Sequence, residues 1–427
     1  MAILGLFVIF LLILLDFSMN RNVFSPVVIF SSLFVFIICL AKLQLYGIAD
    51  FSERSVLLIE LGVICFDIGC IIICELFKNY RKKNIKKVEY AKDLNLNWKI
   101  VNILTVIATF GSIISLFYMT RFLITGGTYI RLRYALLGYN NEPPLIANGA
   151  LRFLTSYVTV PVLYALIPFT LICFVKREKK LFSYIVFANL VLTIVTTGGR
   201  IALIYTVIQF LAVLAYSNIR ISKKTKRTVI AFVGIAFSAV IVLSLVRSSH
   251  SLFKSIYSYF SVPVVLFSTW MDRADSAGMY SYGLSFIYPF TYLLNSLTNF
   301  FNMPIEFLNN VVSWQSLPQD VWIMVFPDQP LNAFCTLFYF FYQDFRSFGV
   351  CFFSFLFGLF SGFYYSRAYL FKSLKYFSVY LLVIKAIVGS FMIWQLGSTS
   401  FFMSWVLFMC CFKRLKKLPS GTMKTIS

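Results

Sequence analysis

The sequence predicts an all-α, polytopic integral membrane protein with about 11 membrane-spanning helices (roughly 10–12) and one large external loop segment. Its composition leaves too few polar groups to cover a soluble globule, since 60% of the 427 residues are hydrophobic and 13% are charged. Apolar runs of membrane-spanning length recur along the chain. Most of the 38 Lys and Arg residues lie in short gaps between these runs.

The expected spans are the apolar runs themselves. The first lacks a basic flank and a small-residue cleavage site, so we expect a retained span rather than a signal peptide. The runs cover residues 2–15, 23–40, 56–77, 100–119, 153–175, 181–195, 201–216, 229–246, 348–365, 376–394 and 401–412.

The basic gaps set the expected orientation. They lie an even number of spans apart and therefore fall on one side, which the positive-inside rule makes cytoplasmic. We expect residues 1–427 to form a single membrane domain with an external N-terminus and a cytoplasmic C-terminus. The basic gaps are 78–99, 176–180, 220–227, 367–375 and 413–424, together with Arg21.

The net charge of +22 does not indicate nucleic-acid binding, because the basic residues flank spans and suit anionic lipid headgroups. Eight of the nine Cys lie in apolar runs and only Cys335 is expected outside, so no disulfide framework is predicted.

Two external segments, 121–152 and 247–346, are expected to cover the active site. In the longer one, the apolar pieces 259–271 and 284–301 contain Pro263 and Pro289 and are separated by charged residues. Such pieces suit interfacial or re-entrant helices above a membrane-facing cavity. An amphiphilic stretch, 332–344, follows them.

The external basic residues are nearly all Arg, whereas Lys dominates inside. Guanidinium binds phosphate oxygens bidentately and stays charged, so this set indicates a lipid with a phosphate or pyrophosphate headgroup. The alternative is that these side chains snorkel to headgroups or pair with outer acids. The set is Arg54, Arg121, Arg131, Arg133, Arg152, Arg200, Arg247, Arg273 and Arg346.

Arg200 is the strongest individual candidate. It ends Thr196-Thr197-Gly198-Gly199-Arg200, a turn that places a cation at the start of the next helix, where the dipole also favours an anion. Arg131 and Arg133 follow a Gly pair and present two guanidinium groups. The alternatives are a tight hairpin with an interfacial Arg, and a solvated or headgroup-bound pair.

The candidate general bases are Asp275, Asp344 and His250. Each lies in the long external segment beside apolar stretches, and His is the side chain suited to proton transfer near neutral pH. For His250, an interfacial position without a role is the alternative.

Three charged residues lie deep within spans, away from the span ends: Glu60, Asp67 and Lys385. Charge at that depth is costly unless paired, so we expect Lys385 to pair with one of the two acids. A proton or cation pathway is the alternative.

Several motifs are absent from the sequence. It has no GxxxxGK[ST] loop, no HExxH, no Cys/His constellation and no Asp-x-Asp pair. We therefore expect no metal and no cofactor, and neither a nucleotide-sugar-dependent nor a metal-dependent enzyme.

The chain resembles the Wzy-type oligosaccharide repeat-unit polymerases of bacterial O-antigen and capsule assembly. The likeness rests on Ser25-Pro26 at the entry to the second span, on Gly198–Arg200, and on Asn332-Ala333-Phe334…Asp344-Phe345…Gly349. Arg346 and Ser347 stand where these proteins often have Gly after Asp-Phe.

The resemblance implies polymerisation of undecaprenyl-pyrophosphate-linked repeat units on the outer side of the inner membrane, with a chain-length regulator and a flippase of the same pathway as partners. Arg200, Arg131 and Arg133 would bind the donor pyrophosphate, and Arg247 or Arg273 would serve the acceptor lipid. Pyrophosphate is a good leaving group, so catalysis needs mainly positioning and electrostatics. A flippase of lipid-linked oligosaccharide and an O-antigen ligase are the alternatives.

Overall fold

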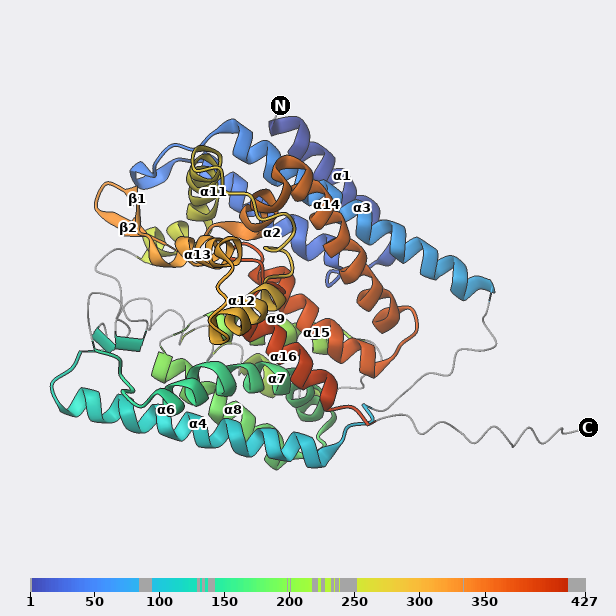
Figure 1. The fold of residues 1–427 in the computed structure, drawn as a ribbon. Coiled ribbons are helices and arrows are strands. Elements are labelled where there is room, and N and C mark those ends of the chain that lie inside the picture. Colours follow the sequence, from blue (N-terminus) through green and yellow to red (C-terminus); the bar gives the residue numbers. More distant parts are fainter. Residues whose placement is uncertain are drawn as a thin grey trace, which may run out of the picture.

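In the computed structural model, the described part of the chain is almost entirely helical (Figure 1). The structure describes residues 2–83, 94–128, 143–197, 201–216, 252–332 and 334–413, with isolated positions at 131–132, 135–136, 199, 222–223, 227–231, 234 and 238. The elements are α1 (Ala2–Asn20), α2 (Pro26–Lys42), η1 (Leu45–Gly47), α3 (Glu53–Lys83), α4 (Trp98–Ile124), α6 (Gly149–Phe153), η3 (Leu154–Thr159), α7 (Val160–Lys176), α8 (Lys180–Thr197), α9 (Ile201–Ala215), α11 (Leu252–Ser276), α12 (Tyr288–Phe300), α13 (Glu306–Asp320), β1 (Ile323–Phe326), β2 (Gln329–Leu331), α14 (Thr336–Tyr369), α15 (Leu374–Gly389) and α16 (Thr399–Cys410).

Five helices in the described ranges are long and apolar enough to cross a membrane. The prediction of a mostly helical chain with membrane-length apolar helices is thereby confirmed, whereas the expected number of spans is not. The remaining expected spans are shorter helices, and the one at 229–246 falls almost entirely outside the described residues. The five are Glu53–Lys82, Trp98–Ile124, Gly149–Lys176, Lys180–Thr197 and Thr336–Tyr369.

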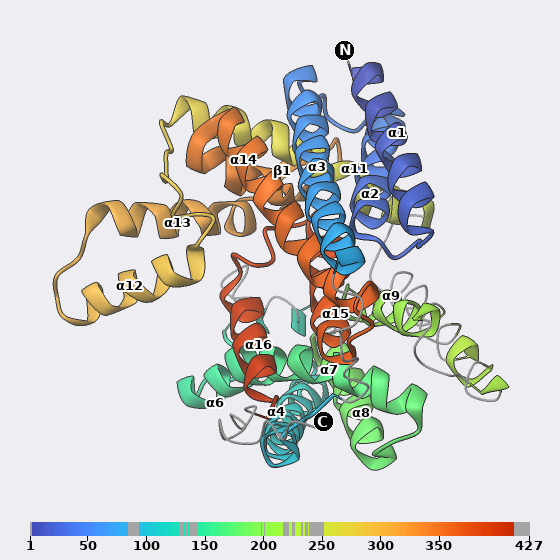
Figure 2. The same cartoon turned by 90° about the vertical axis from the view of Figure 1, so that its right-hand side faces the viewer.

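The two longest helices, α3 and α14, pack closely along each other (Figure 2). A Cβ added at Gly358 of α14 would lie 2.1 Å from the carbonyl oxygen of Phe66 in α3, so only Gly fits this crossing. Small residues allow helix backbones to approach in this way in membranes. The helices α1, α2 and α11 complete this group, while α4, α7 and α8 form a second group (Figure 1).

The Ser-Pro pair near the N-terminus starts α2. The Ser25 hydroxyl accepts a hydrogen bond from the Val28 amide, and Pro26 occupies the first turn, where its missing N–H costs nothing. Ser25 also donates to the buried carboxylate of Asp16 in α1. The local motif therefore joins two helices as well as starting one.

The segment 247–346, for which an external position is expected, differs from the sequence-based prediction in three places. The piece 259–271 belongs to one buried helix, α11, which continues through Pro263 because its apolar residues pack into the core. A β-hairpin, β1–β2, interrupts the predicted all-α fold. The stretch 332–344 is not amphiphilic in its setting, since the first turns of α14 are buried on every side and Cys335 is buried with them.

The expected ion pair of Lys385 with Glu60 or Asp67 is wrong. The Lys385 ammonium lies 3.4 Å from the ring centroid of Tyr164 and 4.5 Å from that of Phe401. Asp67 instead accepts a 2.6 Å hydrogen bond from Ser31. The reason is topological, because α15 packs on α2, α7, α9 and α14 while the two acids lie on α3.

Candidate functional site

A polar network joins the start of α3, the last turn of α11 and the middle of α14. Asp275 receives a 2.8 Å hydrogen bond from the Tyr342 hydroxyl and lies 3.1 Å from Arg54 Nη1 and 3.2 Å from Arg346 Nε. Arg54 also donates to the Tyr342 oxygen at 2.7 Å. Two guanidinium groups and one phenol thus converge on a carboxylate that remains one-third exposed, with a side-chain accessibility of 34%. We call these four residues the Asp275 network.

The position of Arg346 depends on a break in α14. Phe345 and Arg346 leave helical geometry, and Arg346 has φ 54° and ψ −137°, a region that favours glycine. Gly349 then permits the returning chain to approach the Phe341 carbonyl, where a Cβ would lie 2.2 Å from the oxygen. The late sequence pattern therefore encodes a backbone break that carries an Arg.

The Arg346 guanidinium is held on several sides. It donates to the Ala274 carbonyl at 3.1 Å and lies 5.0 Å and 5.3 Å from the ring centroids of Tyr280 and Tyr342. Its Nη1 is buried and has no hydrogen-bond partner among the described residues. A strained backbone and an unsatisfied cationic N–H together are features that accumulate at functional sites.

Asp344, a candidate base, is fully buried beside this break. Its oxygens accept hydrogen bonds from the amides of Gly283, Ser285 and Phe286 at 2.9–3.0 Å and from the Ser281 hydroxyl at 2.9 Å. A carboxylate that is enclosed and satisfied in this way anchors the turn before α12. The geometry therefore favours a structural role for Asp344 over proton transfer.

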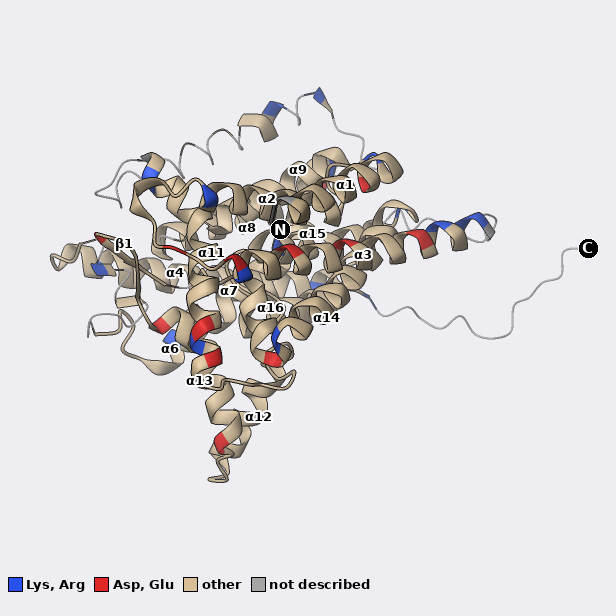
Figure 3. Cartoon of the chain, turned by 90° about the horizontal axis from the view of Figure 1, so that it is seen from above, with Lys and Arg blue, Asp and Glu red and all other residues tan. Residues whose placement is uncertain are grey.

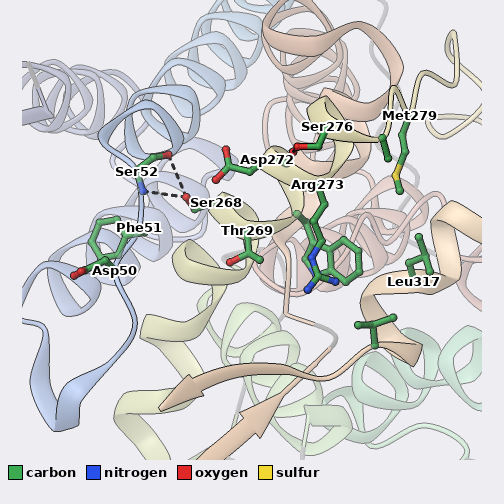
Figure 4. Close-up of a pocket in the computed structure, with 13 residues that line it drawn as sticks. Asp50, Phe51, Ser52, Ser268, Thr269, Asp272, Arg273, Ser276, Met279 and Leu317 are labelled. Atoms are coloured by element: carbon green, nitrogen blue, oxygen red, sulfur yellow. Dashed lines mark hydrogen bonds between the residues drawn. The ribbon is translucent and has the colours of Figure 1, made fainter. Parts of the chain in front are cut away.

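A cleft of about 760 Å³ opens along the other side of the α11 end (Figure 4). Arg273 lies in it, with its guanidinium 5.0 Å from the Trp270 ring centroid. Among the described residues, no carboxylate lies within ion-pair distance of Arg273. Hydroxyl groups of Ser52, Ser268 and Thr269 line the same cleft. Asp50 and Asp272 also line the cleft, so it combines a cation stacked on an aromatic ring, which can bind a phosphate, with carboxylates and hydroxyls that can bind a sugar.

A second pocket, of about 260 Å³, lies where the segment 121–152 meets the end of α8. Its lining includes Leu145 and Arg152 together with Thr196 and Thr197, the first residues of the Gly-Gly-Arg turn. The chain enters this region through η3, a single turn of π-helix, which often marks a functional site. The structure thus brings residues of the segment 121–152 and the first residues of the turn Thr196–Arg200 to one pocket, of which Arg131 is not a lining residue.

The predicted site residues fall into three groups. Asp275 and Arg273 share the last turns of α11, and Arg131 is exposed on the first external loop. Arg133, Arg200, Arg247 and His250 lie outside the described residues. Sequence reasoning missed Tyr342 entirely and noted Arg54 and Arg346 only as members of the external Arg set, although the Gly-to-Arg departure after Asp344-Phe345 did mark Arg346.

Fold and site together define a mostly helical chain with membrane-length apolar helices and an Arg-rich polar network. Comparison with protein-family models, with curated proteins and with solved structures finds no match to this chain.

Proposed function

We propose that the protein polymerises lipid-linked oligosaccharide repeat units on the outer side of the bacterial inner membrane, with about 11 spans and a cytoplasmic C-terminus. The observation that carries this proposal is the position of the Asp275 network and the Arg273 cleft. They lie at the start of α3, whereas α3 ends in Arg81, Lys82 and Lys83 (Figure 3). The positive-inside rule makes that basic end cytoplasmic and the network external.

The proposed chemistry is a glycosyl transfer between two lipid-linked units. The anomeric carbon of the growing chain forms a bond to a hydroxyl oxygen of the incoming unit, and its bond to the pyrophosphate oxygen breaks. The hydroxyl proton passes to the Asp275 carboxylate, and the pyrophosphate leaves with the electron pair, neutralised by guanidinium groups. In this proposal Arg273 holds the acceptor headgroup.

The donor pyrophosphate belongs in the second pocket. The pocket joins the segment that carries Arg131 and Arg133 to the turn that ends in Arg200, and Arg152 lines it. Guanidinium groups from two chain segments would grip a diphosphate bidentately. Arg247, for the acceptor lipid, and His250, as an alternative general base, lie outside the described residues and remain part of this proposal.

The full-length protein in proteoliposomes, supplied with lipid-linked repeat units, tests this function. We expect a ladder of lipid-linked oligomers together with free undecaprenyl pyrophosphate. In Arg200→Ala only single units should remain, whereas Arg81→Ala, at the cytoplasmic end of α3, should retain the ladder. Transfer to another acceptor would identify a ligase instead, and movement of the lipid without a covalent product would identify a flippase; either result overturns the proposal.

A further inference from the structure

The helices α12 and α13 form a hairpin, residues 288–320, that we call the arm. Figures 2 and 3 show the arm projecting from the side of the helix bundle, across the direction of α3. One end of α13 reaches the Arg273 cleft through Leu317, and Val321 follows it there. The other end lies at the tip of the arm.

Burial in α12 is the reverse of that in a water-soluble helix. The polar residues Thr291 and Asn295 are buried, with Asn295 only 7% exposed. The apolar residues Phe290, Leu293 and Leu297 face outward, and Leu293 is 57% exposed. In water the exposure of these side chains forgoes the favourable free energy of burying them. The arrangement is favourable where the surrounding medium is hydrocarbon.

The polar face of α12 is occupied inside the protein. Thr291 donates to the Leu284 carbonyl at 2.9 Å, and the Asn299 amide donates to Asn309 of α13 at 3.0 Å. The Thr291 hydroxyl and the Asn299 amide thus have partners within the protein, as structure placed in lipid requires, whereas the buried Asn295 Oδ1 has no hydrogen-bond partner among the described residues. The apolar side chains Leu293 and Leu297 of α12, by contrast, remain exposed on the surface of the arm.

The arm and its flanking residues carry almost no charge, unlike a protein surface that faces water. Between residues 277 and 319 the sequence has one charged residue, Glu306. The tip exposes Phe300, Phe301 and Met303, with Phe300 79% exposed. At its base, Phe290 contacts Phe402 of α16, with ring centroids 5.0 Å apart, so the apolar face continues onto an apolar helix of the bundle.

We infer that the arm lies at the surface of the outer leaflet, with the apolar face of α12 in the acyl chains and the exposed polar positions of α13, such as Ser313, outside them. Because α13 runs from the tip of the arm to the cleft, its surface also offers a path for the hydrocarbon chain of a lipid substrate. That second statement rests on the proposed function, whereas the immersion of the arm does not.

Photocrosslinking of the full-length protein in phospholipid nanodiscs tests the immersion. The photoreactive residue p-benzoylphenylalanine is placed at Leu297 on the apolar face and, as the control, at Ser313, an exposed polar position of α13. Mass spectrometry should find phospholipid adducts at residue 297 and none at residue 313. Crosslinks from residue 297 to a second copy of the chain, equal lipid adducts at both positions, or none at either would overturn the inference.

A charge introduced on each face provides the second measurement. Leu297→Lys should lower the thermal stability of the nanodisc-embedded protein, because it places an ammonium in hydrocarbon. Ser313→Lys should leave it unchanged. Equal stability of the two variants contradicts the inference. Neither measurement uses polymerase activity, so their outcome is independent of the proposed function.

Discussion

Asp275 Oδ1 lies 3.2 Å from Arg346 Nε, which joins the last turn of α11 to the break in α14. Asp275 lies in the last turn of α11 and Arg346 at the break within α14, so neither helix places them together by itself. Their contact aligns Asp275 with Arg54 and Tyr342 on one side while Arg273 enters the cleft on the other. The last turn of α11 is therefore the element through which a bound headgroup and the network would communicate.

Asp275→Asn is expected to reduce polymer formation by about 10²–10⁴-fold, because an amide cannot accept the hydroxyl proton. Its effect on stability should be small, about 1 kcal/mol or less, since both Asp275 and Arg54 are substantially exposed. Oligomer synthesis in proteoliposomes and thermal unfolding measure the two effects. Asp320→Asn, at the end of α13, is the control, and wild-type synthesis by Asp275→Asn would remove Asp275 from the mechanism.

Two substitutions of Arg346 distinguish the effect of backbone strain from that of the guanidinium group. Arg346→Gly and Arg346→Ala both lose the guanidinium and should both lose polymer formation. Only glycine relieves the strain at φ 54°, ψ −137°, which amounts to about 1 kcal/mol or more. The glycine variant should therefore unfold at a higher temperature than the alanine variant. Thermal unfolding of the two variants measures this difference, and an alanine variant at least as stable as the glycine variant would contradict the strain assignment.

Asp344→Ala is expected to destabilise the fold strongly. It removes the acceptor for Ser281 and for three backbone amides, and each buried donor left unsatisfied costs about 1–3 kcal/mol. Asp344→Asn keeps one carbonyl oxygen and should fall between alanine and wild type. The yield of monodisperse protein and the unfolding temperature report the effect. A normally folded but inactive Asp344→Asn would restore Asp344 as a base.

Substitutions of Tyr164 and Lys385 test whether the aromatic contact of Lys385 stabilises the protein. Tyr164→Leu should destabilise the protein by about 2 kcal/mol through loss of the cation–π contact at 3.4 Å, whereas Tyr164→Phe should be close to wild type. Adding Lys385→Met should abolish the difference between the two Tyr164 variants. A double-mutant cycle of unfolding free energies measures this coupling, and additive effects would exclude it.

The helical class followed from local chemistry. Apolar runs in the sequence became helices, and Ser25-Pro26 marked a helix start, because hydropathy and capping act over a few neighbouring residues. The same approach named Arg273 and Asp275 as candidate site residues, and the structure places both in the last turns of α11. It misread the helix α11, since Pro263 looks like a breaker locally and only its buried packing shows that the helix continues.

The sequence by itself determined a mostly helical chain with membrane-length apolar segments, and it separated Lys-rich from Arg-rich gaps. The tertiary structure alone decided which charges meet. Arg54 and Asp275, which form an ion pair, are 221 residues apart in the sequence. Lys385 contacts aromatic rings rather than an acidic side chain. The physical reason is that span formation depends on transfer of each segment from water to lipid, whereas partner choice depends on which helices pack together, and no single segment encodes that packing.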